Sequence, residues 1–333
     1  MNVLGIGRLC IDKYYYLLSD VERVQSTKQS IGFVGQRIGG SVPRILSCFV
    51  SYGYETTLIS NGSFETNENL FALNQLNLLG IKNNLIIKEK LPESFLLYGS
   101  GNNFISVLSV IENEQQLLTE EDIDIMAINS LDPTLVITDV RHSKASLVAA
   151  KWAKKNNRHI FLDPGSSLMH KIFSASMYSD EIELLRHCTI ICSSEEFYKE
   201  FCSTGNIKDI FNNDLFSDLQ LAICTLSNGV SIIATRDCGF SIARARSIKV
   251  CNSLGTGDVY RGFFLSSLIM DIHRTPLRKE NLEMAAKMAI ASATIQIETS
   301  ELFNSVPTKE KVDEVLMSLH FNKSETTDFI FGM

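Results

Sequence analysis

Gly255, Thr256, Gly257 and Asp258 place two glycines and a carboxylate directly before an apolar segment. Glycine permits positive φ and close approach by another group. The helical spacing of the apolar residues over 259–270 predicts a helix that begins here. Backbone N–H groups at a helix N-terminus bind anions, and a neighbouring carboxylate can accept a proton. The segment therefore predicts a base beside an anion site; an aspartate that only caps the helix is the alternative.

Length, composition and charge restrict the class of protein. The chain has 333 residues, of which 45% are hydrophobic and 21% are charged, which is typical of globular proteins. The net charge of −7 does not favour nucleic-acid binding, which usually requires a basic surface. No run approaches 18 consecutive apolar residues, and the first residues lack a basic leader and a cleavage site. We therefore expect neither a membrane span nor a signal peptide.

The eight cysteines lie mostly within apolar runs such as "CTIICSS" and "LAICTL". None forms a C-x-x-C pair, and their spacing does not match a zinc site. We expect buried, reduced thiols, which indicates a reducing compartment, the cytoplasm.

Short apolar segments alternate with helical patterns along most of the chain. This alternation predicts βαβ units and a mostly parallel sheet that helices cover on both faces. We expect strands at 2–7, 55–60, 134–140, 159–164, 188–194 and 221–226, and helices at 43–53, 68–80, 143–156 and 280–298.

Two segments, 12–36 and 94–111, have the alternation of extended strands instead, with a hairpin turn at 99–103. We predict that they form a small β-sheet that acts as a lid on the α/β core. The core then comprises residues 1–11, 37–93 and 112–322. The polar residues 323–333 are expected to form a loosely held tail.

Four features follow one another along the chain: Asp12 after the first strand, Gly39-Gly40 before a helix, Glu196 in "SSEEFYKEF", and the glycine-rich segment that ends in Asp258. The order and spacing of these four features resemble those of the ribokinase-like (PfkB) family of carbohydrate kinases. The resemblance covers nearly the whole length of the chain. The strongest part of the resemblance is "NSLGTGDVYRGFF", residues 252–264. It implies a three-layer α/β/α fold and an enzyme that uses ATP and Mg²⁺ to phosphorylate a hydroxyl of a small sugar.

The resemblance also implies a role for each matching residue. Asp258 would be the base, and Gly255, Thr256 and Gly257 would form the anion hole. Asp12 would bind hydroxyls of the substrate, while Gly39 and Gly40 would form the hinge of the lid. Glu196 would organise Mg²⁺ through water. Simple turn or helix-capping roles remain the alternative for Asp12, for the two glycines and for Glu196.

On the nucleotide side the sequence departs from the family pattern. Ser193 replaces the asparagine of the N-x-x-E motif. Thr225 begins a loop in which Ser227 replaces a glycine and Gly229 falls one residue early. Asn252 stands where the family usually has an aspartate. These positions correspond to nucleotide contacts in the family, and the resemblance predicts the same role here through a shortened loop.

On the substrate side the main departure is Arg44, which replaces the sugar-binding asparagine of the family's G-G-x-x-x-N pattern. The segment reads "GGSVPR", and its Pro43 is compatible with the first turn of a helix. A guanidinium matches a carboxylate or phosphate better than a neutral hydroxyl. A sugar acid or sugar phosphate is then a possible substrate, unless Arg44 points to solvent.

Other functions remain open at this stage. A vitamin kinase of the pyridoxal type and a nucleoside kinase share the same superfamily, and a metabolite-binding regulator without activity would explain the motif departures. The exposed small sheet also suggests a homodimer through its free face or edge.

Overall fold

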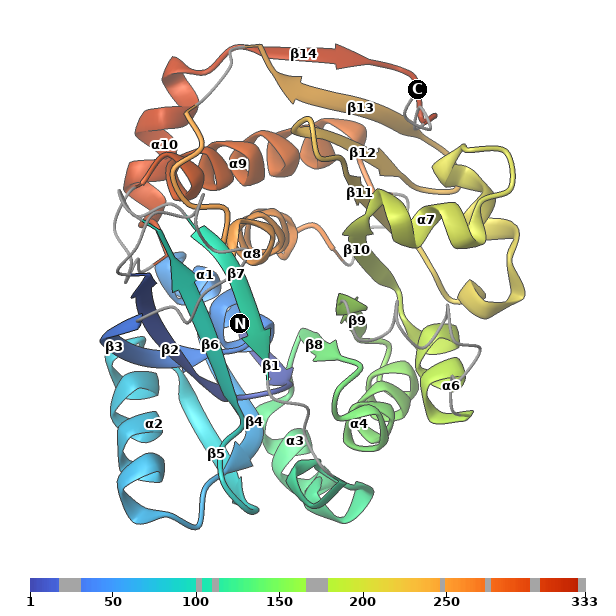
Figure 1. Ribbon diagram of the computed structural model, residues 1–333. Helices are drawn as coiled ribbons and strands as arrows, with labels where there is room; N and C mark the ends of the chain where they lie inside the picture. Colours follow the sequence, from blue (N-terminus) through green and yellow to red (C-terminus); the bar gives the residue numbers. More distant parts are fainter. Residues whose placement is uncertain are drawn as a thin grey trace.

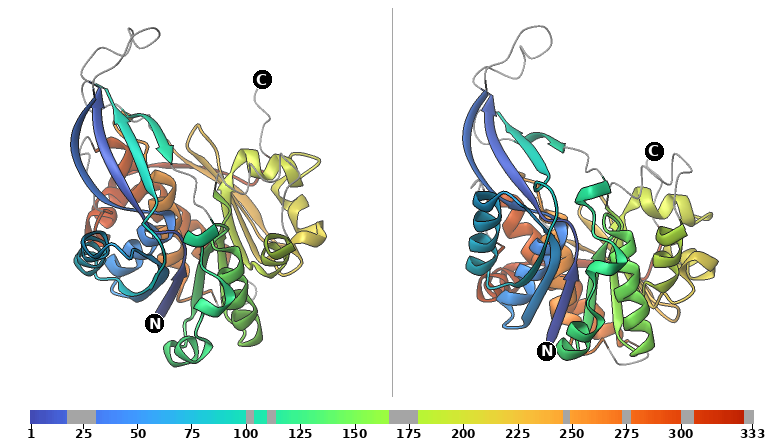
Figure 2. Two further views of the ribbon diagram at one scale, coloured as in Figure 1. Left: turned by 60° about the horizontal axis from the view of Figure 1, so that its bottom comes forward. Right: turned by 90° about the horizontal axis from the view of Figure 1, so that it is seen from below.

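The computed structural model describes residues 1–17, 31–99, 104–109, 114–165, 179–245, 249–272, 277–299 and 306–328. These residues form a large α/β core and a separate small β-sheet (Figure 1). In both views of Figure 2 the small sheet projects from one end of the core. Among the described helices, none combines the length and apolarity needed to cross a bilayer.

The large sheet contains ten strands in the described part of the chain. Their order across the sheet is β14 (Phe321–Ser324), β13 (Gly239–Arg244), β12 (Val230–Ala234), β11 (Leu221–Thr225), β10 (Ile190–Ser194), β9 (His159–Asp163), β8 (Leu135–Asp139), β1 (Asn2–Ile6), β4 (Glu55–Gly62) and β5 (Lys82–Ile87). In this order, neighbouring strands from β11 through β5 are parallel to each other. Neighbouring strands from β14 through β11 are antiparallel. The prediction of a mostly parallel sheet is confirmed.

The parallel strands β8 and β9 are buried at every position. Continuous burial is expected where helices cover both faces of a sheet, because neither face meets water. One face packs against α1 (Ser41–Ser51), α2 (Thr66–Leu78), α8 (Thr256–Leu268) and α9 (Lys279–Glu298). The other face packs against α3 (Ile125–Leu131), α4 (Ser143–Lys155), α6 (Ser179–His187) and α7 (Glu195–Phe201). The fold is therefore the predicted three-layer α/β/α arrangement.

Several short elements complete the core. The helix α10 (Lys309–Ser318) contacts α9. In the described residues, 3₁₀ helices span Glu114–Gln116, Glu120–Asp122, Ile207–Asn212 and Asp214–Phe216.

The small sheet has the strand order β3 (Ile31–Gly39), β2 (Cys10–Leu17), β6 (Glu93–Tyr98) and β7 (Phe104–Ser109). A second, small sheet was predicted from these two parts of the chain, and it is present. Most of the predicted turn at 99–103 lies outside the described residues. In this sheet Asp12 is paired with Arg37 of β3 and with Ser94 of β6. Paired residues face the same side of a sheet, so these three side chains share one face.

The expectation of a loosely held tail is wrong for the residues up to 328. Residues 321–324 form β14, which pairs with β13 at the edge of the large sheet. Further on, Thr327 is buried, and the Asn206 side chain donates a hydrogen bond to Asp328 at 2.6 Å. This polar segment is held by strand pairing and hydrogen bonds, which hydrophobicity does not reveal. Residues 329–333 lie outside the described part.

Candidate functional site

A cavity of about 710 Å³ lies between the small sheet, the N-terminal ends of α1 and α8, and the carboxyl ends of β8 and β9. Arg8, which follows β1, and Asp139, which ends β8, both line it. The strands β1 and β8 are neighbours, but the chain continues from them toward opposite edges of the sheet. Ligands of open α/β sheets bind at such a topological switch point.

The first turn of α8 brings the glycine-rich segment to the cavity. Gly255 is the N-cap residue with a φ of +69°, a left-handed conformation that favours glycine. Farther along, a Cβ at Gly262 would lie 2.5 Å from Cys48 Sγ, so glycine lets α8 pack closely on α1. Thr256 Oγ1 is buried and has no hydrogen-bond partner among the described residues. The first-turn N–H groups and this hydroxyl can all donate to an anion.

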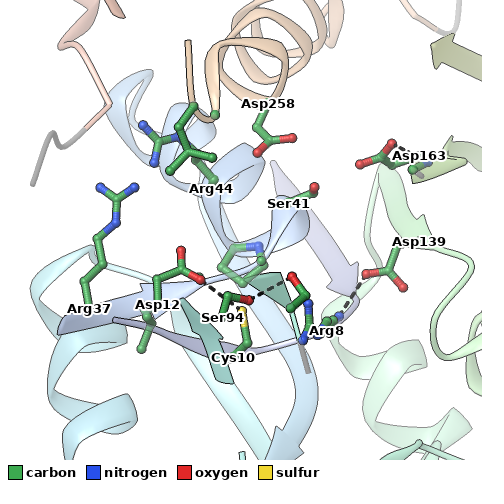
Figure 3. Close-up of a pocket in the computed structure, with 18 of the residues that line it drawn as sticks. Arg8, Cys10, Asp12, Arg37, Ser41, Arg44, Ser94, Asp139, Asp163 and Asp258 are labelled. Carbon is green, nitrogen blue, oxygen red and sulfur yellow. Dashed lines mark hydrogen bonds between the residues drawn. The ribbon is translucent and has the colours of Figure 1, made fainter. Parts of the chain in front are cut away.

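Asp258 lies in the same turn and faces the cavity (Figure 3). Its Oδ1 accepts a hydrogen bond from Arg261 Nη1 at 3.0 Å, and the same nitrogen lies 3.5 Å from Asp163 Oδ2. Burial raises the pKa of Asp258, and Asp163 acts in the same direction, against the charges of Arg261 and Arg44. A carboxylate whose pKa is raised is a better proton acceptor.

Asp12, on β2, reaches the cavity from the opposite side. Burial raises its pKa, while the charges of Arg37, Arg8 and Arg44 lower it. A Cβ at Gly39 would lie 2.3 Å from Asp12 Oδ1. One at Gly40, whose φ is +116°, would lie 2.1 Å from the carbonyl oxygen of Arg8. Both glycines are therefore required by close contacts, in addition to any hinge function.

Asp139 and Asp163 end the neighbouring strands β8 and β9 at the same level. Asp139 Oδ2 accepts a hydrogen bond from the Arg8 N–H at 2.9 Å, and its Oδ1 accepts one from the Arg141 N–H at 2.9 Å. Asp163 Oδ1 accepts a hydrogen bond from the Gly165 N–H at 3.1 Å. Burial raises the pKa of Asp139, against these two backbone hydrogen bonds. The loops at this end of the sheet are thus held by the two carboxylates.

Arg44, in the first turns of α1, lines the cavity rather than pointing away from it. Its side chain packs against the start of α8, because a Cβ at Gly255 would lie 2.5 Å from Arg44 Nε. Burial lowers the pKa of Arg44, and the nearby charge of Arg37 lowers it further. Arginine nevertheless stays charged in proteins. The site therefore has a fixed cation beside the anion-binding turn.

The structure brings together six of the predicted site residues around the cavity, namely Asp12, Gly39, Gly40, Arg44, Gly255 and Asp258. Thr256 and Gly257 follow in the first turn of α8, but they are not among the described residues that line the cavity.

The predicted nucleotide-side residues lie farther along the sheet. Ser193 is in β10, and its carbonyl oxygen accepts a hydrogen bond from Thr225 Oγ1 at the end of β11, at 3.3 Å. Ser227 and Gly229 lie in the turn before β12, where Gly229 has a φ of +82°. Asn252 is buried ahead of α8, and its Oδ1 accepts a hydrogen bond from the Leu254 N–H. None of these five residues is in the described lining of the cavity.

Glu196 is exposed in the first turn of α7. A hydrogen bond from Ser194 and one from its own backbone lower the pKa of Glu196, so it is ionised. Among the described residues there is no cluster of three or more acidic, histidine or cysteine side chains that could hold a metal ion. Mg²⁺ usually keeps several waters and binds through one or two carboxylates and substrate phosphates, so a single acidic residue remains compatible with it.

Five charged residues that line the cavity were not predicted from the sequence: Arg8, Arg37, Asp139, Arg141 and Asp163. The two aspartates each end an apolar strand, and carboxyl ends of parallel strands meet at one edge of a sheet. That signal could have indicated them. The three arginines have no such local pattern, because only the folded chain brings them to the cavity.

No protein-family model matches the chain. A curated relative, the nucleoside kinase of Methanocaldococcus jannaschii, is 27% identical over 193 residues, which are 56% of this chain and 58% of the relative. The chain thus matches little more than half the length of that protein.

Solved structures resemble nearly the whole chain. Ribokinase from Giardia lamblia has a TM-score of 0.75 at 16% identity, covering 95% of this chain and 99% of that one. A candidate ribokinase II from E. coli, solved with ATP and Mg²⁺, has a TM-score of 0.76 at 13% identity, with 95% and 99% covered. Ribokinase from Arabidopsis thaliana, solved with ribose and ATP, has a TM-score of 0.69 at 15% identity, with 94% and 98% covered. The chain therefore has the ribokinase-like fold, as the sequence resemblance predicts.

Proposed function

We propose that the chain is a phosphotransferase that moves the γ-phosphoryl group of ATP to a hydroxyl of a small sugar or sugar derivative. The observation that supports this most directly is the position of Asp258. Its partly buried carboxylate lies in the first turn of α8 and faces the same cavity as Asp12 and Arg44. A base beside an anion-binding helix start is what phosphoryl transfer to an alcohol requires.

In the proposed reaction, Asp258 accepts the proton of the acceptor hydroxyl as the acceptor oxygen forms a bond with the γ-phosphorus. The bond from that phosphorus to the bridging oxygen breaks, and the electron pair leaves with ADP. N–H groups of the turn at Gly255 to Gly257, and the Thr256 hydroxyl, would stabilise charge on the moving oxygens. Asp12 would accept hydrogen bonds from other hydroxyls of the acceptor.

ATP and Mg²⁺ are part of this proposal. The buried Thr256 hydroxyl, which lacks a hydrogen-bond partner in the described structure, fits a phosphate ligand at the start of α8. Ser193, Thr225, Ser227, Gly229 and Asn252 would contact the nucleotide. Glu196 would bind Mg²⁺ through water, and the ion would neutralise phosphate charge. The neighbour solved with ATP and Mg²⁺ supports this choice.

A nucleoside is the second candidate acceptor, because the curated relative is a nucleoside kinase. Both acceptors present a hydroxyl of a sugar ring, so the same base and anion site would serve either one.

We also infer that the protein works in a reducing compartment and forms a homodimer. All eight cysteines are free, and six are buried, which fits a reducing compartment such as the cytoplasm. The outer face of the small sheet contains Tyr15, whose ring contacts those of Phe33 and Phe95, and Phe33 is 58% exposed. We propose that this face forms a homodimer.

The test is ADP formation from ATP and Mg²⁺ with sugars, sugar phosphates, sugar acids, nucleosides and pyridoxal as acceptors. We expect turnover with a sugar-containing acceptor and a loss of about 10²–10⁴-fold in the Asp258→Asn variant. The exposed Asp237 provides the matched control, Asp237→Asn, which should not change the rate.

Undiminished turnover in Asp258→Asn would remove Asp258 from the role of base. Fastest turnover of pyridoxal would make the protein a vitamin kinase. Tight binding of ATP or an acceptor without any turnover would instead favour a metabolite-binding regulator.

A further inference from the structure

Arg44 has buried hydrogen-bond donors that the protein itself does not use. Its Nε and Nη2 atoms are buried and have no hydrogen-bond partner among the described residues. The nearby carboxylate of Asp258 accepts its side-chain hydrogen bond from Arg261 instead. A buried charged group without partners is costly, and native proteins rarely retain one without a ligand or water. The donors of Arg44 are therefore available to a ligand in the cavity.

A second guanidinium, that of Arg37, lies on the same side of the cavity (Figure 3). It is 5.3 Å from the ring centroid of Tyr14, and contact with an aromatic face orients the planar group. The charge of Arg37 is close enough to Arg44 to lower the pKa of Arg44. Two nearby cations repel each other, and an anion bound between them would offset this repulsion.

We propose that the phosphoryl acceptor carries an anionic group, a phosphate or a carboxylate, which binds between Arg37 and Arg44. This inference rests on the proposed function and names the class of acceptor. The acceptor hydroxyl lies toward Asp258, and the anionic group lies toward the small sheet. A neutral sugar would leave the two guanidinium groups with weaker partners, since hydrogen bonds between charged groups are about twice as strong as neutral ones.

The location favours the acceptor over the nucleotide as the source of this anion. Arg37 belongs to β3 of the small sheet and is paired with Asp12, the predicted contact to the acceptor. The predicted nucleotide contacts Ser193 and Thr225 are in β10 and β11, which lie beyond β9 in the sheet. A phosphate of the nucleotide would have to cross the position of the acceptor to reach Arg37.

The experiment measures kcat/KM for ADP formation with matched sets of five- and six-carbon sugars. Each set contains the neutral sugar, its terminal phosphate and the corresponding sugar acid, so that phosphate and carboxylate are distinguished. We expect an anionic member to exceed its neutral counterpart by about 10- to 100-fold, the usual value of a hydrogen bond to a charged group. Arg44→Gln and Arg37→Gln should remove most of this preference. Arg278→Gln, at an exposed position outside the cavity, is the net-charge control and should retain it.

Two results would overturn the inference. One is a neutral sugar as the best acceptor of the wild-type protein. The other is an Arg44→Gln variant whose kcat/KM falls by the same factor with neutral and with anionic acceptors. That result would mean that Arg44 contacts the transferred phosphoryl group instead. A dependence of KM on ionic strength that is confined to anionic acceptors would support the inference.

Calorimetry of the same sugar sets with Asp258→Asn separates this inference from the proposed function. One outcome is that an anionic sugar binds tightly, that Arg44→Gln weakens this binding, and that the wild-type protein shows no turnover. This outcome supports the inference, while the proposed function fails. Turnover that is restricted to neutral sugars or nucleosides supports the function and contradicts the inference. Absence of binding by every anionic member contradicts the inference directly.

Discussion

Asp258 combines burial with nearby charges of both signs. Its Oδ1 lies 3.0 Å from Arg261 Nη1, and Asp163 Oδ2 lies 3.5 Å from the same nitrogen. Burial raises the pKa of the Asp258 carboxylate despite the cations. The folded protein therefore binds the proton of this group more tightly than the unfolded chain does. The contribution of Asp258 to stability is present at low pH and is lost as the pH rises through its folded pKa.

This environment predicts that Asp258→Asn stabilises the fold at neutral pH. The amide removes the cost of a buried charge, while Arg261 keeps its contact with Asp163. The melting temperature of the variant should exceed that of the wild type at pH 7.5, and the difference should shrink toward pH 5. Thermal denaturation at several pH values measures it.

Asp122 provides a control of opposite sign. Although burial acts to raise the pKa of Asp122, hydrogen bonds from Lys88 and Thr119 lower it. Asp122→Asn should therefore destabilise the protein at pH 7.5. A lower melting temperature for Asp258→Asn than for the wild type at every pH would contradict the prediction. It would show that the ion pair of Asp258 with Arg261 stabilises the fold by more than the burial of the Asp258 charge destabilises it.

At the residue scale, sequence alone indicates those groups whose neighbours in the chain reveal them. Asp258 and Gly255 belong to one contiguous motif, and Arg44 follows two glycines at a fixed spacing. Arg37 carries no such local pattern, and Asp163 is marked only by its place at the end of an apolar strand. They reach the cavity because β3 pairs with β2 and because β9 ends beside β8. Contacts between segments distant in the chain are not encoded in local spacing.

At the scale of elements, the start of α8 depends on Gly255 for two separate reasons. Its φ is +69°, and an added Cβ would lie 2.5 Å from Arg44 Nε. Gly53 at the end of α1 has a φ of +80°, but a Cβ there would have no heavy atom within 4 Å. The two positions therefore separate backbone strain from displacement of Arg44.

We predict that Gly255→Ala and Gly53→Ala each lose roughly 1–2 kcal/mol of stability, the cost of a left-handed conformation for alanine. Only Gly255→Ala should also lower kcat/KM, because the added Cβ would displace Arg44. A misplacement of about 1 Å in a reactive site can cost about 10²-fold in rate. Denaturant unfolding and steady-state kinetics provide the two measurements. Equal losses of activity in both variants would mean that contact with Arg44 does not matter.

Most core elements were predictable because their burial follows from the large sheet. The strands β1, β8, β9 and β10 are short apolar runs, and the helix α4 has clear periodicity. Edge strands were missed for a physical reason. The strand β14 has the sequence FNKS and is largely exposed, so backbone pairing holds it rather than hydrophobic burial.

At the scale of the whole molecule, the small sheet has two different faces. Its inner face bears Asp12 and Arg37 and closes one side of the cavity. Its outer face bears the aromatic cluster of Tyr15, Phe33 and Phe95. An exposed apolar patch of this kind is typical of an interaction surface.

We predict that the protein sediments as a dimer at micromolar concentration and that Phe33→Glu shifts it to a monomer. A charge on the outer face would have to be desolvated in the dimer, which opposes association. Leu78→Glu is the matched control, because Leu78 is 81% exposed and lies on α2 rather than on this face. A wild-type monomer, or a dimer that Phe33→Glu leaves intact, would contradict the prediction.

The central claim is that Asp258 removes a proton from an acceptor that binds beside the N-terminus of α8. Its most direct test is a single-turnover measurement of labelled γ-phosphoryl transfer from ATP, comparing wild type with Asp258→Asn while calorimetry monitors ATP affinity. The account predicts a transfer rate about 10²–10⁴-fold slower in the variant at unchanged ATP affinity. Equal transfer rates in the two proteins would contradict it.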